Sequence, residues 1–178
     1  RPPPSHAYLF FLGLWVCWPQ TTHLFSGVEN SPKKRSALVD VSRETLTPIF
    51  GELTDQALEY GQILASTAVE RGLIGPREVD RIWDRHIFNS LPLITLMPKG
   101  ATVIDIGSGA GLPGVVLGLA RPDLQITLLE PLERRATFLL EVVAQIGLTN
   151  LQVVRGRAEE HKARYQIVTA RAVAPLPK

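Results

Sequence analysis

The chain has 178 residues, 45% hydrophobic and 20% charged, which suits one globular domain with a sizeable core. Its net charge of +2 does not by itself indicate a nucleic-acid partner, although arginines cluster locally. The single cysteine, Cys17, excludes an intrachain disulfide framework and a multi-cysteine metal site, so we expect a cytoplasmic protein without a metal.

The first forty residues precede the region with regular periodicity. Residues 7–18, AYLFFLGLWVCW, form an apolar run that is too short for the ~20 residues of a membrane-spanning helix, so we expect no membrane span. A stretch rich in serine, proline, lysine and arginine follows at residues 31–36. We interpret residues 1–40 as a disordered or non-native extension outside the fold, such as upstream sequence read through from a misplaced start.

Residues 41–98 are expected to form an N-terminal helical cap. Apolar residues recur at helical spacing from Leu53 to Ala68 and predict a first helix that begins near Glu52. Pro76 suits the first position of a second helix. This second helix should end by Pro92, and its apolar face carries Val79, Ile82, Trp83, His86 and Ile87.

From residue 99 onward, short apolar runs alternate with longer amphipathic ones. The short runs predict strands over 102–106, 125–129, 151–154 and 167–170, with helices over 113–120 and 131–146 between them. This alternation is typical of a parallel, helix-covered sheet, so we predict an α/β fold with residues 99–178 as its core. In the second of these helices we expect an inward face of Ala136, Leu139, Leu140, Val143 and Ile146.

The segment 103–114, VIDIGSGAGLPG, carries the strongest functional signal. It reads as a buried strand that ends in a glycine-rich turn and opens a helix, an arrangement that lets backbone N–H groups approach a nucleotide-derived cofactor. Gly109, Gly111 and Gly114 satisfy the dinucleotide fingerprint G-x-G-x-x-G, with Glu130 near the expected downstream distance. However, the strand runs directly into Gly107, so the turn begins one glycine earlier.

This earlier register, Gly107-x-Gly109-x-Gly111, favours S-adenosylmethionine over a dinucleotide. A pyrophosphate needs a helix N-terminus aimed at it, whereas S-adenosylmethionine carries a sulfonium and an amino acid. Asp105 could act electrostatically on the positive methionine end, directly or through water. Glu130, which ends the next strand, could accept hydrogen bonds from both ribose hydroxyls.

Several candidate residues have a structural interpretation beside the functional one. Asp105 could simply cap the turn, and Glu159 could be a solvated residue in the first turn of a helix. His86 lies on an apolar face, where a histidine is more often a core residue than a substrate contact. Arg171 follows the fourth strand and could bind the cofactor, bind an RNA phosphate or lie free on the surface.

Six ordered motifs closely resemble the RsmG family, also called glucose-inhibited division protein B. They are DRH with NS at 84–90, DIGSGAGLPG at 105–114, RP at 121–122, LLE at 128–130, RGRAEE at 155–160 and ARA at 170–172. The resemblance covers about residues 53–174, and the text VERGLIGPREV at 69–79 is similar to the actinobacterial branch.

The resemblance implies a Rossmann-like, S-adenosylmethionine-dependent methyltransferase that acts on N7 of a guanine in 16S ribosomal RNA. The family pattern implies cofactor contacts at Gly107, Leu112, Glu130, Ala158, Glu159 and Arg171. It also implies about three more strands than the chain provides, so we expect a C-terminally truncated fragment whose strand at 167–170 is left as a sheet edge. We expect a monomer whose partner is 16S ribosomal RNA or the small-subunit particle.

Guanine N7 already carries an unprotonated lone pair at neutral pH, so we assign no catalytic acid or base and expect positioning to dominate. Arginines that could contact RNA phosphates, or merely solubilise the surface, are Arg134, Arg135, Arg155, Arg157 and Arg164. Two alternatives remain open at this point. One is a nicotinamide-dependent oxidoreductase, and the other is an inactive fragment of the methyltransferase.

Overall fold

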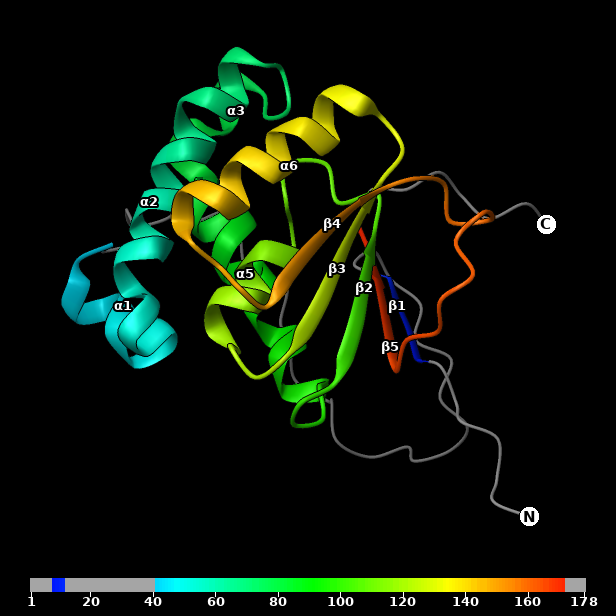
Figure 1. Ribbon diagram of the computed structural model, residues 1–178. Coiled ribbons are helices and arrows are strands. Elements are labelled where there is room, and N and C mark those ends of the chain that lie inside the picture. Colours follow the sequence, from blue (N-terminus) through cyan, green and yellow to red (C-terminus); the bar gives the residue numbers. More distant parts are fainter. Residues whose placement is uncertain (1–7, 12–40, 172–178) are drawn as a thin grey trace, which may run out of the picture.

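The computed structural model describes residues 8–11 and 41–171, and its centre is a parallel five-stranded sheet (Figure 1). The strands are β1 (Tyr8–Phe11), β2 (Thr102–Ile106), β3 (Gln125–Glu130), β4 (Leu151–Arg155) and β5 (Ile167–Ala170). Their order across the sheet is β1-β5-β2-β3-β4. The four strands predicted from the alternating apolar runs are confirmed, and so is the α/β fold.

Two helices pack against one face of the sheet. They are α5 (Gly114–Ala120), between β2 and β3, and α6 (Glu133–Ile146), between β3 and β4. Figure 1 shows both on the same side of the sheet, with the remaining helices outside them. The irregular segment 156–166 connects β4 to β5, and its residues lie against the other face of the sheet.

The inward face of α6 differs in one respect from the prediction. Leu140 was expected to face inward but is 56% exposed, while Phe138 and Val142 are buried beside Leu139. Successive residues turn by about 100° around a helix, so a stripe centred near Leu139 carries Leu140 away from the core. The helix ends at Gly147, whose φ of 68° lies in the left-handed region.

The cap is a run of short helical pieces rather than two regular helices. It consists of α1 (Arg43–Phe50), η1 (Gly51–Leu53), α2 (Thr54–Ala65), α3 (Thr67–Glu70), η2 (Pro76–Arg81), η3 (Ile82–Ile87), α4 (Phe88–Ser90) and η4 (Leu91–Leu96). The first predicted helix corresponds to η1, α2 and α3. The second is replaced by a 3-10 turn, a π-helical turn and two further short pieces.

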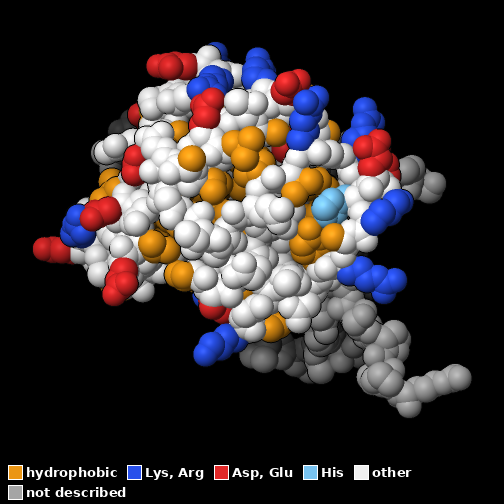
Figure 2. All heavy atoms as spheres, in the orientation of Figure 1, with side chains coloured by type: hydrophobic (Ala, Val, Ile, Leu, Met, Phe, Trp, Pro, Cys, Tyr) orange, Lys and Arg blue, Asp and Glu red, His pale blue; other side chains and the backbone are white. Residues whose placement is uncertain are grey.

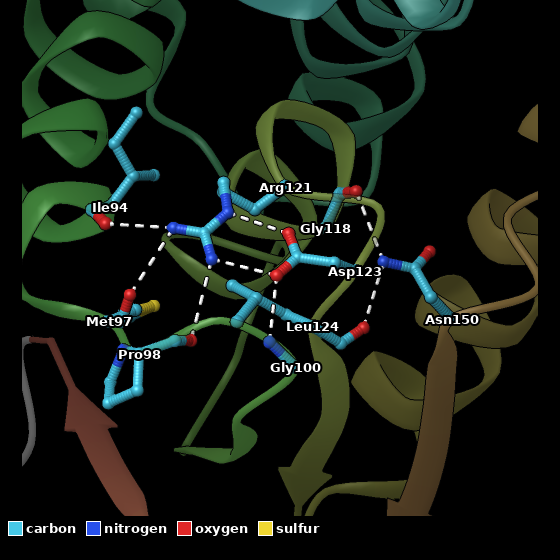
Figure 3. A network of polar contacts seen from close by, with 9 residues as sticks. All are labelled: Ile94, Met97, Pro98, Gly100, Gly118, Arg121, Asp123, Leu124 and Asn150. Atoms are coloured by element: carbon cyan, nitrogen blue, oxygen red, sulfur yellow. Dashed lines mark hydrogen bonds and ion pairs between the residues drawn. The ribbon is translucent and has the colours of Figure 1, made fainter.

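A polar network fastens the end of the cap to the sheet (Figure 3). The Arg121 guanidinium donates to the carbonyls of Ile94, Met97 and Pro98 and pairs with Asp123 at 2.7 Å. Asp123 in turn accepts the N–H of Gly100 at 2.8 Å. Below this network, buried side chains from α1 to β5 form one continuous hydrophobic cluster, so cap and sheet share a core.

The first strand changes one expectation about the sheet. The strand at 167–170 was expected at an edge, but β1 pairs with β5 in parallel, with Tyr8 opposite Ile167 and Phe11 opposite Ala170. The remainder of the proposed extension 1–40 lies outside the described residues. None of the helices in the described part of the chain is long and apolar enough to cross a membrane.

Candidate functional site

The sheet topology places a crevice beside the glycine-rich turn. Chain order runs outward from β2 to β3 and β4, and then returns to β5 on the other side of β2. In open parallel sheets, ligands bind where the strand order reverses, at the carboxyl ends of the strands. Gly107 directly follows β2 and Arg171 directly follows β5, so both lie at this reversal point.

The turn itself begins at Gly107, as the earlier register predicts. Gly107, Gly109 and Gly111 have φ angles of 69°, 58° and 98°, a left-handed region that other residues rarely adopt. The Gly107 N–H donates to the carbonyl of Leu129 at 2.8 Å, which fixes the start of the turn to the end of β3. Three alternating residues therefore require glycine for backbone reasons alone.

Asp105 is enclosed beneath this turn. Its Oδ2 accepts the N–H of Gly114 at 3.2 Å, and its Oδ1 accepts the hydroxyl of Thr169 at 3.0 Å. The side chain has no exposed surface, and burial raises the pKa of this carboxyl to about 6. These contacts are those of a cap that joins β2, β5 and the start of α5, and they leave the carboxylate no exposed surface for direct contact with a ligand.

Gly114 makes this contact possible. A Cβ at this position would lie 2.3 Å from Leu128 Cδ2 and 2.9 Å from Asp105 Oδ2. Gly111 is similarly crowded, since its Cβ would lie 2.6 Å from Val115 Cγ2 and 2.9 Å from the Tyr60 hydroxyl. The glycines of this loop thus serve close packing as well as backbone conformation.

Glu130 is also occupied by backbone groups. Its Oε2 accepts the N–H of Gly109 at 2.9 Å, and its Oε1 accepts the N–H of Leu132 at 3.1 Å. The carboxylate is only 1% exposed and ties the glycine turn to the end of β3. Each oxygen has a second lone pair that these bonds leave for a further donor.

A cavity of about 330 Å³ opens between the glycine turn and the cap. It brings together three of the predicted cofactor residues of the turn, Gly107, Gly109 and Leu112, with Arg171 from the end of β5. The cap contributes the segment 73–75, Glu78 and His86, and α6 contributes Arg135. Asp105, Gly111 and Glu130, which were also predicted as cofactor residues, do not line this cavity.

Ala158 and Glu159 lie elsewhere. Ala158 lines a larger cavity of about 710 Å³ on the other face of the sheet, together with Ile106, Leu129 and Tyr165. The Glu159 side chain is 70% exposed and lies 3.7 Å from Arg157. Ala158 and Glu159 are therefore not brought together with Gly107, Gly109, Leu112 and Arg171 in the cavity beside the glycine turn.

Tyr60 and Glu78 were not predicted as functional, His86 was assigned mainly to the core, and Arg135 was considered only as an RNA contact. Tyr60, fully buried in α2, donates its hydroxyl to the carbonyl of Ala110 at 2.9 Å, and burial raises its pKa. A phenol in an otherwise apolar stripe was the available signal, because a buried hydroxyl needs a partner. Arg135, Glu78 and His86 face the cavity, and the buried Arg135 Nε has no hydrogen-bond partner among the described residues.

His86 contacts both an acidic and a basic residue of the cavity, Glu78 and Arg171. Its Nε2 lies 3.1 Å from Glu78 Oε2, and its Nδ1 lies 3.4 Å from Arg171 Nη2. Burial and then the positive charge of Arg171 lower the pKa of His86, partly offset by Glu78. Burial also lowers the pKa of Arg171. His86 is thus a half-buried, fully bonded residue, as its apolar face suggested, and it also lines the cavity.

The arginines considered for RNA contact are not all free. Arg155 pairs with Glu133 at 3.2 Å, and Arg157 lies within 3.7 Å of Glu159. Figure 2 shows acidic and basic side chains interspersed around the visible face rather than a field of one sign. No group of three or more histidine, cysteine, aspartate or glutamate side chains within the described residues could hold a metal ion.

The sequence of the chain is similar to those of known proteins. The family model described as rRNA small subunit methyltransferase G matches residues 53–178. A ribosomal RNA small subunit methyltransferase G from Thermobifida fusca is 59% identical over 141 residues, covering 78% of this chain and 58% of the relative. The protein of the same name from Kineococcus radiotolerans is 52% identical over 161 residues, covering 89% of this chain and 61% of the relative.

The fold has a counterpart among solved structures. A mutant of MtNAS in complex with S-adenosylmethionine superposes with a TM-score of 0.50 at 15% sequence identity. The superposition covers 74% of this chain and 52% of that one, and at this identity it supports the fold alone. The chain spans about three fifths of the length of the two curated relatives. The family match and these identities show that the chain belongs to the rRNA small subunit methyltransferase G family.

Proposed function

We propose that the chain carries the S-adenosylmethionine site of a methyltransferase that modifies N7 of a guanine in 16S ribosomal RNA. Membership of the family supports the methyltransferase assignment. The choice of guanine N7 comes from the resemblance of the motifs. The choice of cofactor rests on the geometry of the glycine turn.

The observation that carries the cofactor assignment is the contact between Asp105 and the start of α5. A pyrophosphate would need free N–H groups at that helix start, but the Gly114 N–H already donates to the Asp105 carboxylate at 3.2 Å. A carboxylate there repels a phosphate and attracts a sulfonium cation. The residues present therefore fit S-adenosylmethionine better than a nicotinamide dinucleotide, which disfavours the oxidoreductase alternative.

The residues proposed to hold the cofactor act in three ways. Gly107, Gly109 and Leu112 line the cavity, and Arg171, which follows the neighbouring strand β5, offers guanidinium donors to the same space. Glu130 has lone pairs left for the ribose hydroxyls and fixes the turn through Gly109. Gly111 supports the turn through packing. The cofactor contacts of Ala158 and Glu159 are proposed from the resemblance alone. For Ala158 to contact the cofactor, the cofactor must extend past Leu129, which lines the same cavity as Ala158.

When bound, S-adenosylmethionine supplies an electrophilic methyl group on a sulfonium. The chain's own task is then to hold the guanine in line with that methyl group, which can contribute roughly 7–11 kcal/mol through proximity and orientation. Guanine N7 needs no deprotonation, so we propose no general base. We further propose that the protein acts in the cytoplasm as a monomer, without a metal, on the ribosomal RNA or the small-subunit particle.

Isothermal titration of S-adenosylmethionine into the 178-residue chain tests this proposal, with NADH fluorescence as the comparison. Saturable binding of S-adenosylmethionine without NADH binding is the expected result. Methyl transfer from labelled cofactor to small-subunit particles would then establish the substrate, with an affinity for RNA that falls steeply with salt. Cofactor binding without methyl transfer would identify an inactive fragment, and NADH binding would overturn the cofactor assignment.

A further inference from the structure

Three side chains form a continuous path across the cavity, from the cap to the end of β5. Glu78 belongs to η2, His86 to η3, and Arg171 follows β5. The Glu78 carboxylate contacts His86 Nε2 at 3.1 Å, and His86 Nδ1 contacts Arg171 Nη2 at 3.4 Å. Residues 78 and 171 are distant in sequence, so the histidine is the link between two separate elements.

The chemistry of the end groups fixes the proton on the ring between them. A guanidinium has only donors, so the contact with Arg171 requires a lone pair on His86 Nδ1. The proton of the neutral ring must then be on Nε2, where it donates to the Glu78 carboxylate. The carboxylate therefore selects the tautomer that can accept a hydrogen bond from Arg171.

We propose that Glu78 is a positioning residue that acts through neutral His86 to orient the Arg171 guanidinium toward the cofactor cavity. This inference rests on the proposed function for the ligand that Arg171 contacts, but the relay itself does not depend on it. When His86 holds one nitrogen of the planar Arg171 guanidinium, the orientation of that plane and of the remaining N–H donors of Arg171 is fixed. Without Glu78, the ring can adopt the other tautomer, whose Nδ1–H would oppose Arg171.

The charged groups that face His86 make the relay sensitive to acid. These groups are Glu78 from η2, Arg85 from η3 and Arg171, which follows β5. Arg85 also binds the Glu78 carboxylate, at 2.9 and 3.2 Å, so Glu78 has two partners. Protonation of Nδ1 would remove its lone pair and place a second cation against Arg171, which breaks the contact.

Nitrogen-15 NMR of the imidazoles tests the relay without any ligand. The chain has four histidines, and the His86 resonances can be assigned by their loss in His86→Asn. The native chain is expected to show the Nε2–H tautomer of His86. Glu78→Ala should give a mixture of tautomers and a lower His86 pKa, whereas Glu78→Gln should keep the tautomer because its amide oxygen accepts from Nε2.

Arg85→Ala is the matched control, because it removes the other partner of Glu78 and leaves the contact with His86. It should preserve the tautomer, and Arg171→Met should raise the His86 pKa. The same Nε2–H tautomer in Glu78→Ala, or an equal change in Arg85→Ala, would overturn the relay. Dispersed amide spectra verify that each variant is folded.

Cofactor binding then tests whether the relay acts through Arg171. Glu78→Ala and Arg171→Met should each weaken S-adenosylmethionine binding about tenfold, the size of one lost hydrogen bond to a charged group. The double variant should bind within about twofold of Arg171→Met alone, since residues of one network are not additive. If the affinity losses of the two single variants multiply in the double variant, the positioning role of Glu78 is overturned. If the native chain binds no cofactor, the proposed function fails while the NMR result still decides the relay.

Discussion

The Asp105 carboxylate lies inside the molecule and accepts two hydrogen bonds, from Gly114 and Thr169. Burial nevertheless raises its pKa to about 6, against 3.8 for an exposed aspartate. The folded state therefore binds this proton more tightly than the unfolded state. The contribution to stability is fully present below about pH 4 and is lost as the pH rises through about 6.

This linkage predicts the behaviour of Asp105→Asn. Between about pH 4 and pH 7 the native chain should lose about 2 kcal/mol in its free energy of unfolding from this group. The asparagine can accept from Gly114 and donate to Thr169, so the variant should fold and lack this dependence. Urea unfolding of both proteins across this pH range measures the difference. Equal slopes in the two proteins would show that Asp105 does not titrate as its burial implies.

Gly114 predicts a steric effect at the same point. A Cβ there would lie 2.3 Å from Leu128 Cδ2, in a packed region between β3 and α5. Gly114→Ala should therefore cost about 1–3 kcal/mol of stability, as overpacked cores do, and weaken cofactor binding. Gly156→Ala is the control, because its nearest contact would be Leu129 Cδ1 at 3.7 Å. Thermal unfolding of both variants measures the contrast, and equal stability would contradict the crowding argument.

At the scale of elements, the network around Arg121 determines how the cap meets the sheet. Its guanidinium donates to the carbonyls of Ile94, in η4, and of Met97 and Pro98, which follow η4, and its ion pair with Asp123 is partly exposed. The exposed pair alone contributes little, so the carbonyl bonds dominate the expected effect. A lysine has no planar fork and cannot serve these acceptors together.

Arg121→Lys should accordingly lower the free energy of unfolding by about 1–2 kcal/mol. The matched control is Arg81→Ala, whose half-exposed side chain lies 3.6 Å from Asp84 and should matter by less than about 0.5 kcal/mol. Chemical denaturation separates the two cases. A loss in the control as large as in Arg121→Lys would mean that surface charge, rather than the carbonyl network, is responsible.

The elements differ in how well the sequence predicts them. The strands and the helices between them were predictable, because short apolar runs alternate with amphipathic ones and glycine or proline bounds the strands at 102–106, 125–130 and 151–155. Helix α1 was not predicted, although Leu46 and Phe50 are buried at helical spacing and Ser42 caps its start. Pro48 lies inside this helix, and Arg43, Glu44 and two threonines surround the apolar residues, so the helical spacing of Leu46 and Phe50 was obscured. The 3-10 and π turns of the cap were also not predictable, since they depend on tertiary packing, of η3 against α2 and of η4 against α5.

At the scale of the whole molecule, the same limit applies to the candidate site. The register of the glycine turn was predictable because the backbone demands glycine directly after β2. The contacts of Tyr60, Glu78 and Arg135 were not, because they depend on how the cap sits over the turn. Local sequence therefore determines the turn, and tertiary packing determines which side chains surround the cavity.

The shared core predicts that cap and sheet unfold as one unit. Buried residues of the cap, such as Leu64 and Ile87, belong to the same cluster as Val115 of α5 and Leu128 of β3. The hydroxyl of Tyr60 further bonds the cap to the glycine turn. Native-state hydrogen exchange should therefore give equal opening free energies for amides of α2 and β3, and added S-adenosylmethionine should raise both equally.

Tyr60→Phe provides the sharper version of this test. It keeps the ring but leaves the buried Ala110 carbonyl without its donor, which should cost about 1–3 kcal/mol. Because cap and sheet form one cooperative unit, the loss should appear equally in amides of α2 and β3, far from the substituted atom. A loss confined to α2 would instead show that residues 41–98 open on their own, and the proposed division into cap and sheet would then be a division into two folding units.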